Sequence, residues 1–455
     1  MTTIPAKMDE QDVDRGPVVV LDAPLTGVRP GLRVDSVDVL RGLTIFLMIF
    51  VNDLGRAAPS WLHHIRPPRA DGMTLADIVF PSFLFIVGVS IPLAFERAAE
   101  LGASRWQQLR HILGRSASLL LLGVIELNHD DDTTLGGRIW GLLAFLSVIL
   151  AWCSLPRNHG PKRNILLGLK VLGVAGMIGL LAIYRRSPES TSLPFYGAVD
   201  GWVWLRTSWW GILGLIGWAY LTVALLTLLI GSRREWLMGA MGLLMMLHLA
   251  THDRGLFDRV DDKAWLDPVR GAVDLLARGF DGIQGYVGLG DATGSLAAVT
   301  MAGCLLGSIL RRDSTVRSHK ERIAWASTFV VGLVLAGALT DTFEGINKIG
   351  ATPTWCFWSA AIATSAWILL FAIIDVAGFR AWTFLFRPAG ANPLLAYFLH
   401  PITIWLIGLA GFGSAILGYT GSPDPWAVVG GSAAMAVFVC GAAGLLARLG
   451  LRVRL

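Results

Sequence analysis

Residues 74–95 read TLADIVFPSFLFIVGVSIPLAF, an apolar run with Asp77 as its only charged residue. A helix needs about 20 apolar residues to cross a bilayer, so this run is long enough to span one. The whole chain has the same character, with 54% hydrophobic and 16% charged residues in 455. Soluble domains carry about 25% charged residues. The sequence therefore predicts an all-α, polytopic integral membrane protein.

Apolar runs like this one recur along the chain and predict about 12 transmembrane helices, with 10–12 as the range. Residues 1–35 form an expected flexible cytoplasmic segment without the apolar core of a cleavable signal peptide. Residues 36–455 are expected to form one transmembrane domain. The predicted spans are residues 37–55, 74–95, 110–126, 138–155, 164–184, 210–231, 235–250, 292–310, 323–340, 352–374, 391–412 and 426–447.

The distribution of charge predicts the orientation, because Lys and Arg concentrate in cytoplasmic loops. Basic groups such as Arg97, Arg105 and Arg110 fall on one side of the predicted spans, and the acidic run Asp130–Asp132 falls on the other. Both termini are then cytoplasmic. The longer outer loops are residues 56–73, 185–209 and 251–291, and we expect short helices in the last of them. Topology accounts for the formal charge of +5 without a nucleic-acid partner.

The first outer loop combines several groups that suit acid–base chemistry. It contains His63 and His64, it follows Asn52 at the end of the first span, and it precedes Asp77. A carboxylate beside an imidazole fixes its tautomer and raises its basicity, and an amide can stabilise an oxyanion. Alternatively, Asp77 follows Thr74 by three residues and completes a helix cap, and Asn52 closes the first helix.

Other polar groups follow later in the chain. Glu344, Asn347 and Lys348 lie on the predicted outer face, and His400 lies in NPLLAYFLHP, near mid-membrane. An ionisable residue at that depth is a functional candidate, although a neutral imidazole bonded to a neighbouring helix is the alternative. Four widely separated cysteines form no CxxC pair, so we expect neither a metal site nor disulfides.

Several of these stretches resemble a known family. RVDSVDVLRGLTIFLMIFVN, the loop histidines, DGMTLADIVFPSFLFIVGVSI, RIWGLLAFLSVILAW, SLAAVTMAGCLLGSIL, INKIGATPTW and NPLLAYFLHP are similar to the transmembrane acyltransferases related to heparan-α-glucosaminide N-acetyltransferase, whose bacterial relatives include NagX-like proteins. The resemblance implies transfer of an acetyl group from acetyl-CoA to the amine of a glucosamine-type sugar.

The resemblance also implies roles for individual residues. His64, or else His63, matches the catalytic loop histidine, Asn52 matches the asparagine of the first helix, and Asp77 matches the acid after the loop. Direct transfer and an acetyl-histidine intermediate both stay open. Cations are needed for the phosphates of acetyl-CoA, and acceptor contacts are expected on polar residues near the outer face. The candidates are Arg41, Lys348 and Arg138 for acetyl-CoA, with Arg66 and Arg69 as further cations, and Glu344, Asn347, Asn392 and His400 for the acceptor.

The expected location is a bacterial inner membrane, with the catalytic loop on the periplasmic side and lipids as neighbours; a homodimer stays open. The main alternative is a transporter or flippase for a sugar or lipid-linked intermediate, which would also use many spans and a mid-membrane His400. A second alternative is O-acetylation of a surface glycan, which needs the same donor and a hydroxyl acceptor.

Overall fold

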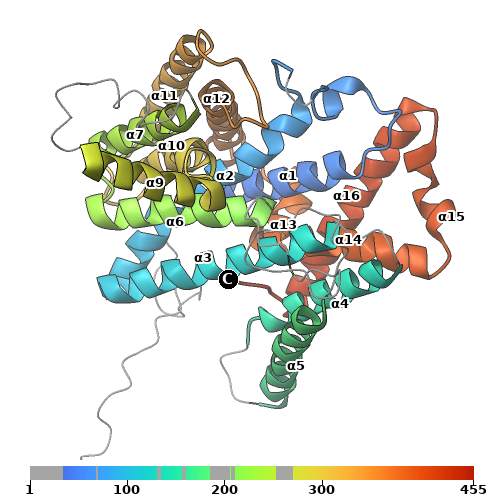
Figure 1. The fold of residues 1–455 in the computed structure, drawn as a ribbon. Coiled ribbons are helices and arrows are strands. Elements are labelled where there is room, and N and C mark those ends of the chain that lie inside the picture. The colour runs from blue at the N-terminus through green and yellow to red at the C-terminus, as the bar shows by residue number, and fades with distance from the viewer. Residues whose placement is uncertain are drawn as a thin grey trace, which may run out of the picture.

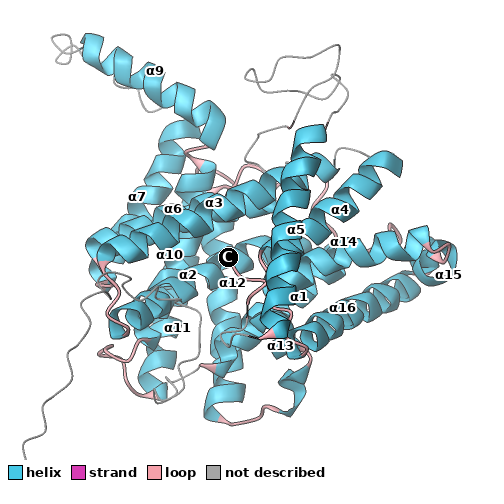
Figure 2. Cartoon of the chain, turned by 90° about the horizontal axis from the view of Figure 1, so that it is seen from below, coloured by secondary structure: helices cyan, strands magenta, loops and turns pink. Residues whose placement is uncertain are grey.

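The computed structural model describes residues 34–67, 70–130, 135–155, 160–184, 205, 211–252 and 270–455. These residues form helices joined by loops, and their one β-type contact is an isolated bridge between Cys153 and Val453. Figure 2 shows this helical composition. The predicted all-α class is therefore confirmed. The predicted flexible segment and the predicted outer loop 185–209 lie almost wholly outside the described residues.

The helices pack as a bundle (Figure 1). In chain order they are α1 (Asp35–Asn52), η1 (Ser60–Leu62), α2 (Leu75–Glu100), α3 (Arg105–Asp130), α4 (Leu135–Ala151), α5 (Pro161–Ile183), α6 (Ile212–Ile230), α7 (Arg234–His252), α9 (Arg270–Val287), η3 (Asp291–Ser295), α10 (Leu296–Leu310), α11 (His319–Thr340), α12 (Pro353–Leu370), η4 (Phe371–Val376), η5 (Ala381–Phe384), α13 (Phe386–Ala391), α14 (Pro393–Leu409), α15 (Gly413–Leu417), η6 (Gly418–Gly421) and α16 (Pro425–Arg448).

Each of the twelve predicted segments coincides with one of these helices, within a few residues at each end. Among the described residues, 7 helices are long and apolar enough to cross a membrane, and the apolar stretches Ile139–Ala151 and Pro393–Leu409 are shorter. Within the predicted outer loop 251–291, the part that the structure describes contains helix α9. The 7 helices are residues Leu75–Glu100, Arg163–Ile183, Ile212–Ile230, Asp291–Leu310, His319–Thr340, Pro353–Val376 and Pro425–Arg448.

The centre of the bundle is α10, in which every residue is buried. It packs against α2, α6, α7 and α12. Its contact with α2 requires glycine, because a Cβ atom on Gly303 would lie 1.8 Å from the carbonyl oxygen of Phe85, and one on Gly88 would lie 1.8 Å from that of Thr300. Small residues allow helix backbones to approach this closely, which is how helices pack in lipid. The contact with α10 thus fixes the middle of α2, the helix whose first turn contains Asp77.

Candidate active site

Asp77 is held at the start of α2 by hydrogen bonds to one of its two carboxylate oxygens. Oδ2 accepts from the backbone N–H groups of Ile65 at 3.1 Å and Thr74 at 3.2 Å, and the Thr74 hydroxyl lies 3.0 Å away. The predicted helix cap is therefore confirmed. The side chain of Asp77 is 1% exposed. Because Oδ2 is used by the cap, Oδ1 is left to face the loop.

His64 contacts that second oxygen. Its Nδ1 lies 2.7 Å from Oδ1 of Asp77, and its side chain is 52% exposed. With Nδ1–H donating to the carboxylate, the lone pair of a neutral imidazole lies on Nε2, where it can accept a proton. His63 differs, because its Nε2 is buried and has no hydrogen-bond partner among the described residues. The geometry of a carboxylate–imidazole pair thus belongs to His64.

A second loop, between α11 and α12, docks against the histidine loop. The backbone N–H of Gly72 donates to the carbonyl of Ile346 at 2.8 Å, and the N–H of Ile346 donates to Oδ1 of Asp71 at 2.7 Å. The Asn347 amide also donates to the carbonyl of Ala70 at 3.3 Å. Two loops that are far apart in the sequence are therefore joined into one surface.

This docking brings Lys348 to the pair. Its Nζ lies 3.2 Å from Nδ1 of His64 and 3.9 Å from Oδ1 of Asp77. Burial lowers the pKa of the Lys348 amine, and the nearby Asp77 carboxylate acts in the opposite direction with a smaller effect. Lys348 therefore belongs to the same cluster of charged and polar groups as His64 and Asp77.

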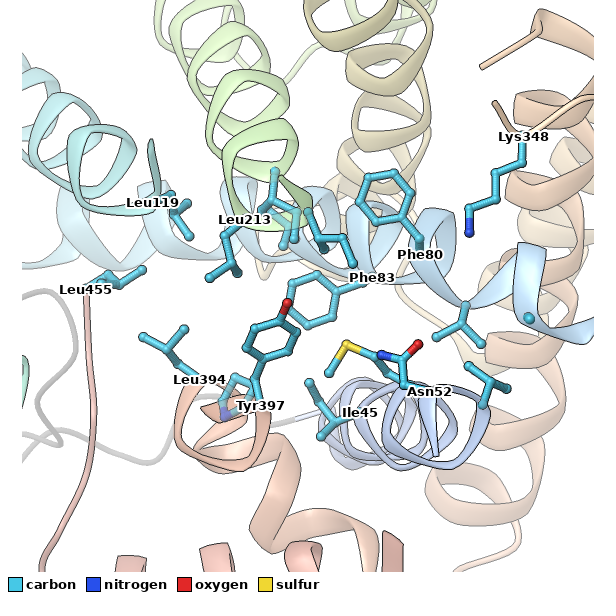
Figure 3. A pocket seen from close by; sticks show the side chains of 18 of the residues that line it. Ile45, Asn52, Phe80, Phe83, Leu119, Leu213, Lys348, Leu394, Tyr397 and Leu455 are labelled. Carbon is cyan, nitrogen blue, oxygen red and sulfur yellow. The ribbon is translucent and has the colours of Figure 1, made fainter. Parts of the chain in front are cut away.

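Next to these groups lies a cavity of about 130 Å³ with mainly apolar walls. A cavity that holds one water molecule has a volume of about 10–15 Å³, so this cavity is much larger than one solvent molecule. Its lining comes from α1, α2, α3, α6 and α14. Figure 3 shows Lys348 and Asn52 at one side, Tyr397 and Phe83 in the middle, and Leu119 and Leu455 at the other side. His64 and Asn52 both line it, so the cavity connects the predicted base and the predicted amide donor.

The sequence analysis did not single out Arg115, which also lines the cavity, from α3. Its guanidinium carbon lies 4.9 Å from the centre of the Tyr220 ring, and its Nε is buried without a hydrogen-bond partner among the described residues. The sequence does offer a signal for Arg115, because this arginine directly precedes the apolar stretch that continues α3. Among these largely apolar walls, Arg115 supplies a positive charge for an anionic group.

The remaining predicted site residues make contacts away from the cavity or lie outside the described residues. Arg41 lies towards the opposite end of α1, with Asp38 at 3.1 Å and the Ser90 hydroxyl at 2.9 Å. Asn392 binds the C-terminal segment through the carbonyl of Leu451 and the N–H of Val453, both at 3.1 Å. The side chain of Arg138 and the whole of Arg69 lie outside what the structure describes, and Arg66 is exposed.

Two predicted acceptor residues pair with buried groups. His400 Nε2 lies 3.5 Å from Oδ1 of Asp53, whose other oxygen accepts from the Tyr419 hydroxyl. Glu344 contacts His248 at 3.5 Å. The structure thus gathers Asn52, His64, Asp77 and Lys348 at one place, with Asn347 joining the two loops, whereas Arg41, Glu344, Asn392 and His400 do not line the cavity.

Comparison with known proteins agrees with this picture. Human heparan-alpha-glucosaminide N-acetyltransferase is 36% identical over 136 residues, which are 30% of this chain and 19% of the human protein. The mouse enzyme of the same name is 38% identical over 108 residues, 24% of this chain and 16% of its own length. The chain thus matches less than a fifth of the length of either relative.

The family described as "Domain of unknown function (DUF5009)" matches residues 33–260, about half of the chain, which include α1, α2 and the loop with both histidines. This match and the two partial identities confirm the predicted relationship to these acyltransferases. The chain belongs to the DUF5009 family and is related to the heparan-alpha-glucosaminide N-acetyltransferases.

Proposed function

We propose that this protein is a membrane-bound acetyltransferase that moves the acetyl group of acetyl-CoA to the amine of a glucosamine-type sugar. The observation that carries the proposal is the contact of 2.7 Å between His64 and the buried Asp77, at the edge of a cavity large enough for more than solvent. Two related proteins that carry the name of such an enzyme support the choice of acetyl donor and amine acceptor.

The proposed reaction begins with removal of a proton from the ammonium of the acceptor by Nε2 of His64. The amine then attacks the thioester carbonyl, and the carbon–sulfur bond breaks as the amide forms. The proton held by His64 passes to the departing thiolate, which leaves as free CoA, and the second proton of the attacking nitrogen is released to water. Asp77 keeps the proton on Nδ1 and stabilises the imidazolium. Attack by His64 itself would instead give an acetyl-histidine. Both routes use the same lone pair.

Two cavity residues complete the proposed site. Asn52 stands at the end of α1 and lines the cavity beside His64; its amide would donate to the oxyanion of the tetrahedral intermediate, an effect worth about 10²–10³-fold in rate in other enzymes. Arg115 provides a charge for an anionic part of the donor, and it takes the place that we predicted for Arg41. Lys348 lies so close to His64 that binding the phosphates of the donor cannot be its only role. We assign it the role of offsetting the negative charge of Asp77.

We also propose the topology that the charge pattern predicts. The twelve helices would cross an inner membrane, with both termini in the cytoplasm and the His64 loop on the periplasmic side. The structure supports this arrangement, since Asn52 and Asp77 lie at one end of α1 and α2 whereas Arg97 lies at the other end of α2. Labelling of single introduced cysteines in residues 56–60 and 311–317 with a membrane-impermeant reagent would test it.

The test of function uses purified full-length protein with acetyl-CoA and glucosamine. We expect free CoA and N-acetylglucosamine in equal amounts, detected by mass spectrometry, and we expect His64→Ala to lower kcat by about 10²–10⁴-fold. His63→Ala is the matched control, since that imidazole has no partner on Asp77, and it should retain activity. Wild-type turnover in His64→Ala would remove the imidazole from the mechanism. Ester products in place of the amide would redirect the proposal to O-acetylation.

A thermal-shift measurement with CoA separates an enzyme from a transporter. A ligand that binds the folded state stabilises it by RT ln(1 + [L]/Kd), about 2.7 kcal/mol at 100 times Kd. The acetyltransferase proposal requires such stabilisation by CoA. A transporter of sugars would be stabilised by its cargo and not by CoA.

A further inference from the structure

A fully buried histidine lies outside the cavity. His248 on α7 is 0% exposed and has a carboxylate on each side of its ring. Its Nδ1 lies 3.3 Å from Oδ1 of Asp291 and 3.2 Å from the carbonyl of Gly290, and its Nε2 lies 3.5 Å from Oε2 of Glu344. The proposed reaction uses none of these three side chains.

The two carboxylates belong to parts of the protein that differ in how firmly they are held. Asp291 begins η3, which leads directly into the buried helix α10, and α7 packs against both. Glu344 lies in the loop between α11 and α12. Oε2 of Glu344 is itself buried, and its ion-pair contact among the described residues is with Nε2 of His248. His248 therefore attaches a loop to the centre of the bundle.

That loop is the one that presents Lys348, four residues after Glu344. Its own hydrogen bonds make it compact: the Thr352 hydroxyl donates to the carbonyl of Gly345 at 2.8 Å, and the Thr354 hydroxyl donates to that of Glu344 at 2.5 Å. Ala351 adopts φ 47°, a left-handed conformation that is rare for residues other than glycine. A displacement of Glu344 would therefore be transmitted to Lys348.

We infer that His248 is a positioning residue: it bridges Asp291 and Glu344, and through Glu344 it fixes the loop that sets Lys348 against His64 and Asp77. Among the described residues, the loop contacts His248 through Glu344 and residues 70–72 through Ile346 and Asn347. Only the expected changes in kcat and KM depend on the proposed function. The position of Lys348 is measurable without any substrate.

The experiment measures how labelling of Lys348 by an amine-reactive ester depends on pH. The full-length protein is labelled in detergent, and the modified lysine is quantified by mass spectrometry. Burial is the larger influence on the pKa of this amine, so release of the loop into water raises the pKa although the Asp77 carboxylate is also lost. The pH midpoint of Lys348 labelling should therefore rise.

Three single variants and one double variant make the test specific. Glu344→Ala removes the attachment, and His248→Leu leaves Glu344 facing an apolar side chain, so both should raise the midpoint. Glu344→Gln preserves the size and shape of the side chain beside His248 and should keep the wild-type midpoint. The double variant His248→Leu/Glu344→Ala should shift no further than either single variant, because both changes act through one contact.

The inference is overturned if Glu344→Ala, with a melting transition that shows it to be folded, has the wild-type midpoint. It is also overturned if the two single shifts add in the double variant. In acetyl transfer, Glu344→Ala should lower kcat more than it raises KM for glucosamine. A shifted midpoint in a protein without acetyltransferase activity would uphold the role of His248 and refute the proposed function, so the two failures are distinguishable.

Discussion

Replacing Asp77 by Asn tests the dyad most sharply, since the two side chains have the same shape. The Asn carbonyl oxygen can still accept from the N–H groups of Ile65 and Thr74, so most of the helix cap survives. The amide NH₂ group then faces His64 and donates to Nδ1, where the carboxylate accepted at 2.7 Å. The imidazole must carry its proton on Nε2, and the lone pair needed by the acceptor amine is lost.

The expected loss is on the order of 10²–10⁴ in kcat, or about 3–5 kcal/mol in the activation barrier. The free energy of unfolding should fall by no more than about 0.5–2 kcal/mol, the range for a lost helix cap. Asp77→Ala is the comparison variant, because it removes both functions and should lose activity and melting temperature together. Initial rates and melting curves on the same preparations separate the two effects.

A normal kcat in Asp77→Asn would refute the reasoning, since it would mean that the tautomer of His64 does not matter. A loss of activity that follows a collapse of the melting temperature would also count against it. In that case Asp77 would act as a structural cap, which its buried Oδ2 contacts already explain.

Three further predictions concern other parts of the bundle. Gly303→Val should prevent folding, because its side chain would overlap the backbone of Phe85 across the α2–α10 contact; the readout is the yield of monodisperse protein in detergent, and Gly332→Val, at a position with open space, is the control. Tyr419→Phe removes the hydroxyl that donates to the buried Asp53, and it should lower the free energy of unfolding by about 1–3 kcal/mol. Chemical denaturation measures this change, and an unchanged value would show that water or His400 replaces the hydroxyl. Arg115→Met should weaken CoA binding by about 10-fold, the equivalent of 1.4 kcal/mol, with little change in melting temperature; unchanged affinity in calorimetry would exclude Arg115 from the donor site.

The sequence predicted the helices well because each predicted span is built on an apolar run. The structure forms a helix at each one, and 7 helices among the described residues are long and apolar enough to cross a membrane. The pairing of a loop histidine with Asp77 was also predictable, although the sequence left the choice between His64 and His63 open. The loop joins two neighbouring antiparallel helices, so its ends are close together, and the three-residue spacing from Thr74 places Asp77 in the first turn of α2.

Contacts between distant loops were not predictable in the same way. Lys348 reaches His64 because the backbone of Ile346 pairs with Gly72, and backbone hydrogen bonds leave no signal in side-chain chemistry. Arg115 and His248 were visible as ionisable residues within or beside apolar segments, but their surroundings depend on packing between helices. His400 was expected at an acceptor site, and its neighbour in the structure is Asp53 at the end of α1.

The burial of α10 has a consequence for how the chain is made. The segment that matches the DUF5009 family ends at residue 260, before α10 and before Lys348. While a ribosome is still producing that first half, the surface of α10 against which Gly88 of α2 packs has not yet been made. The contact between α2 and α10 can form only after residues 296–310 have been synthesised, so the centre of the bundle is completed by the second half of the chain.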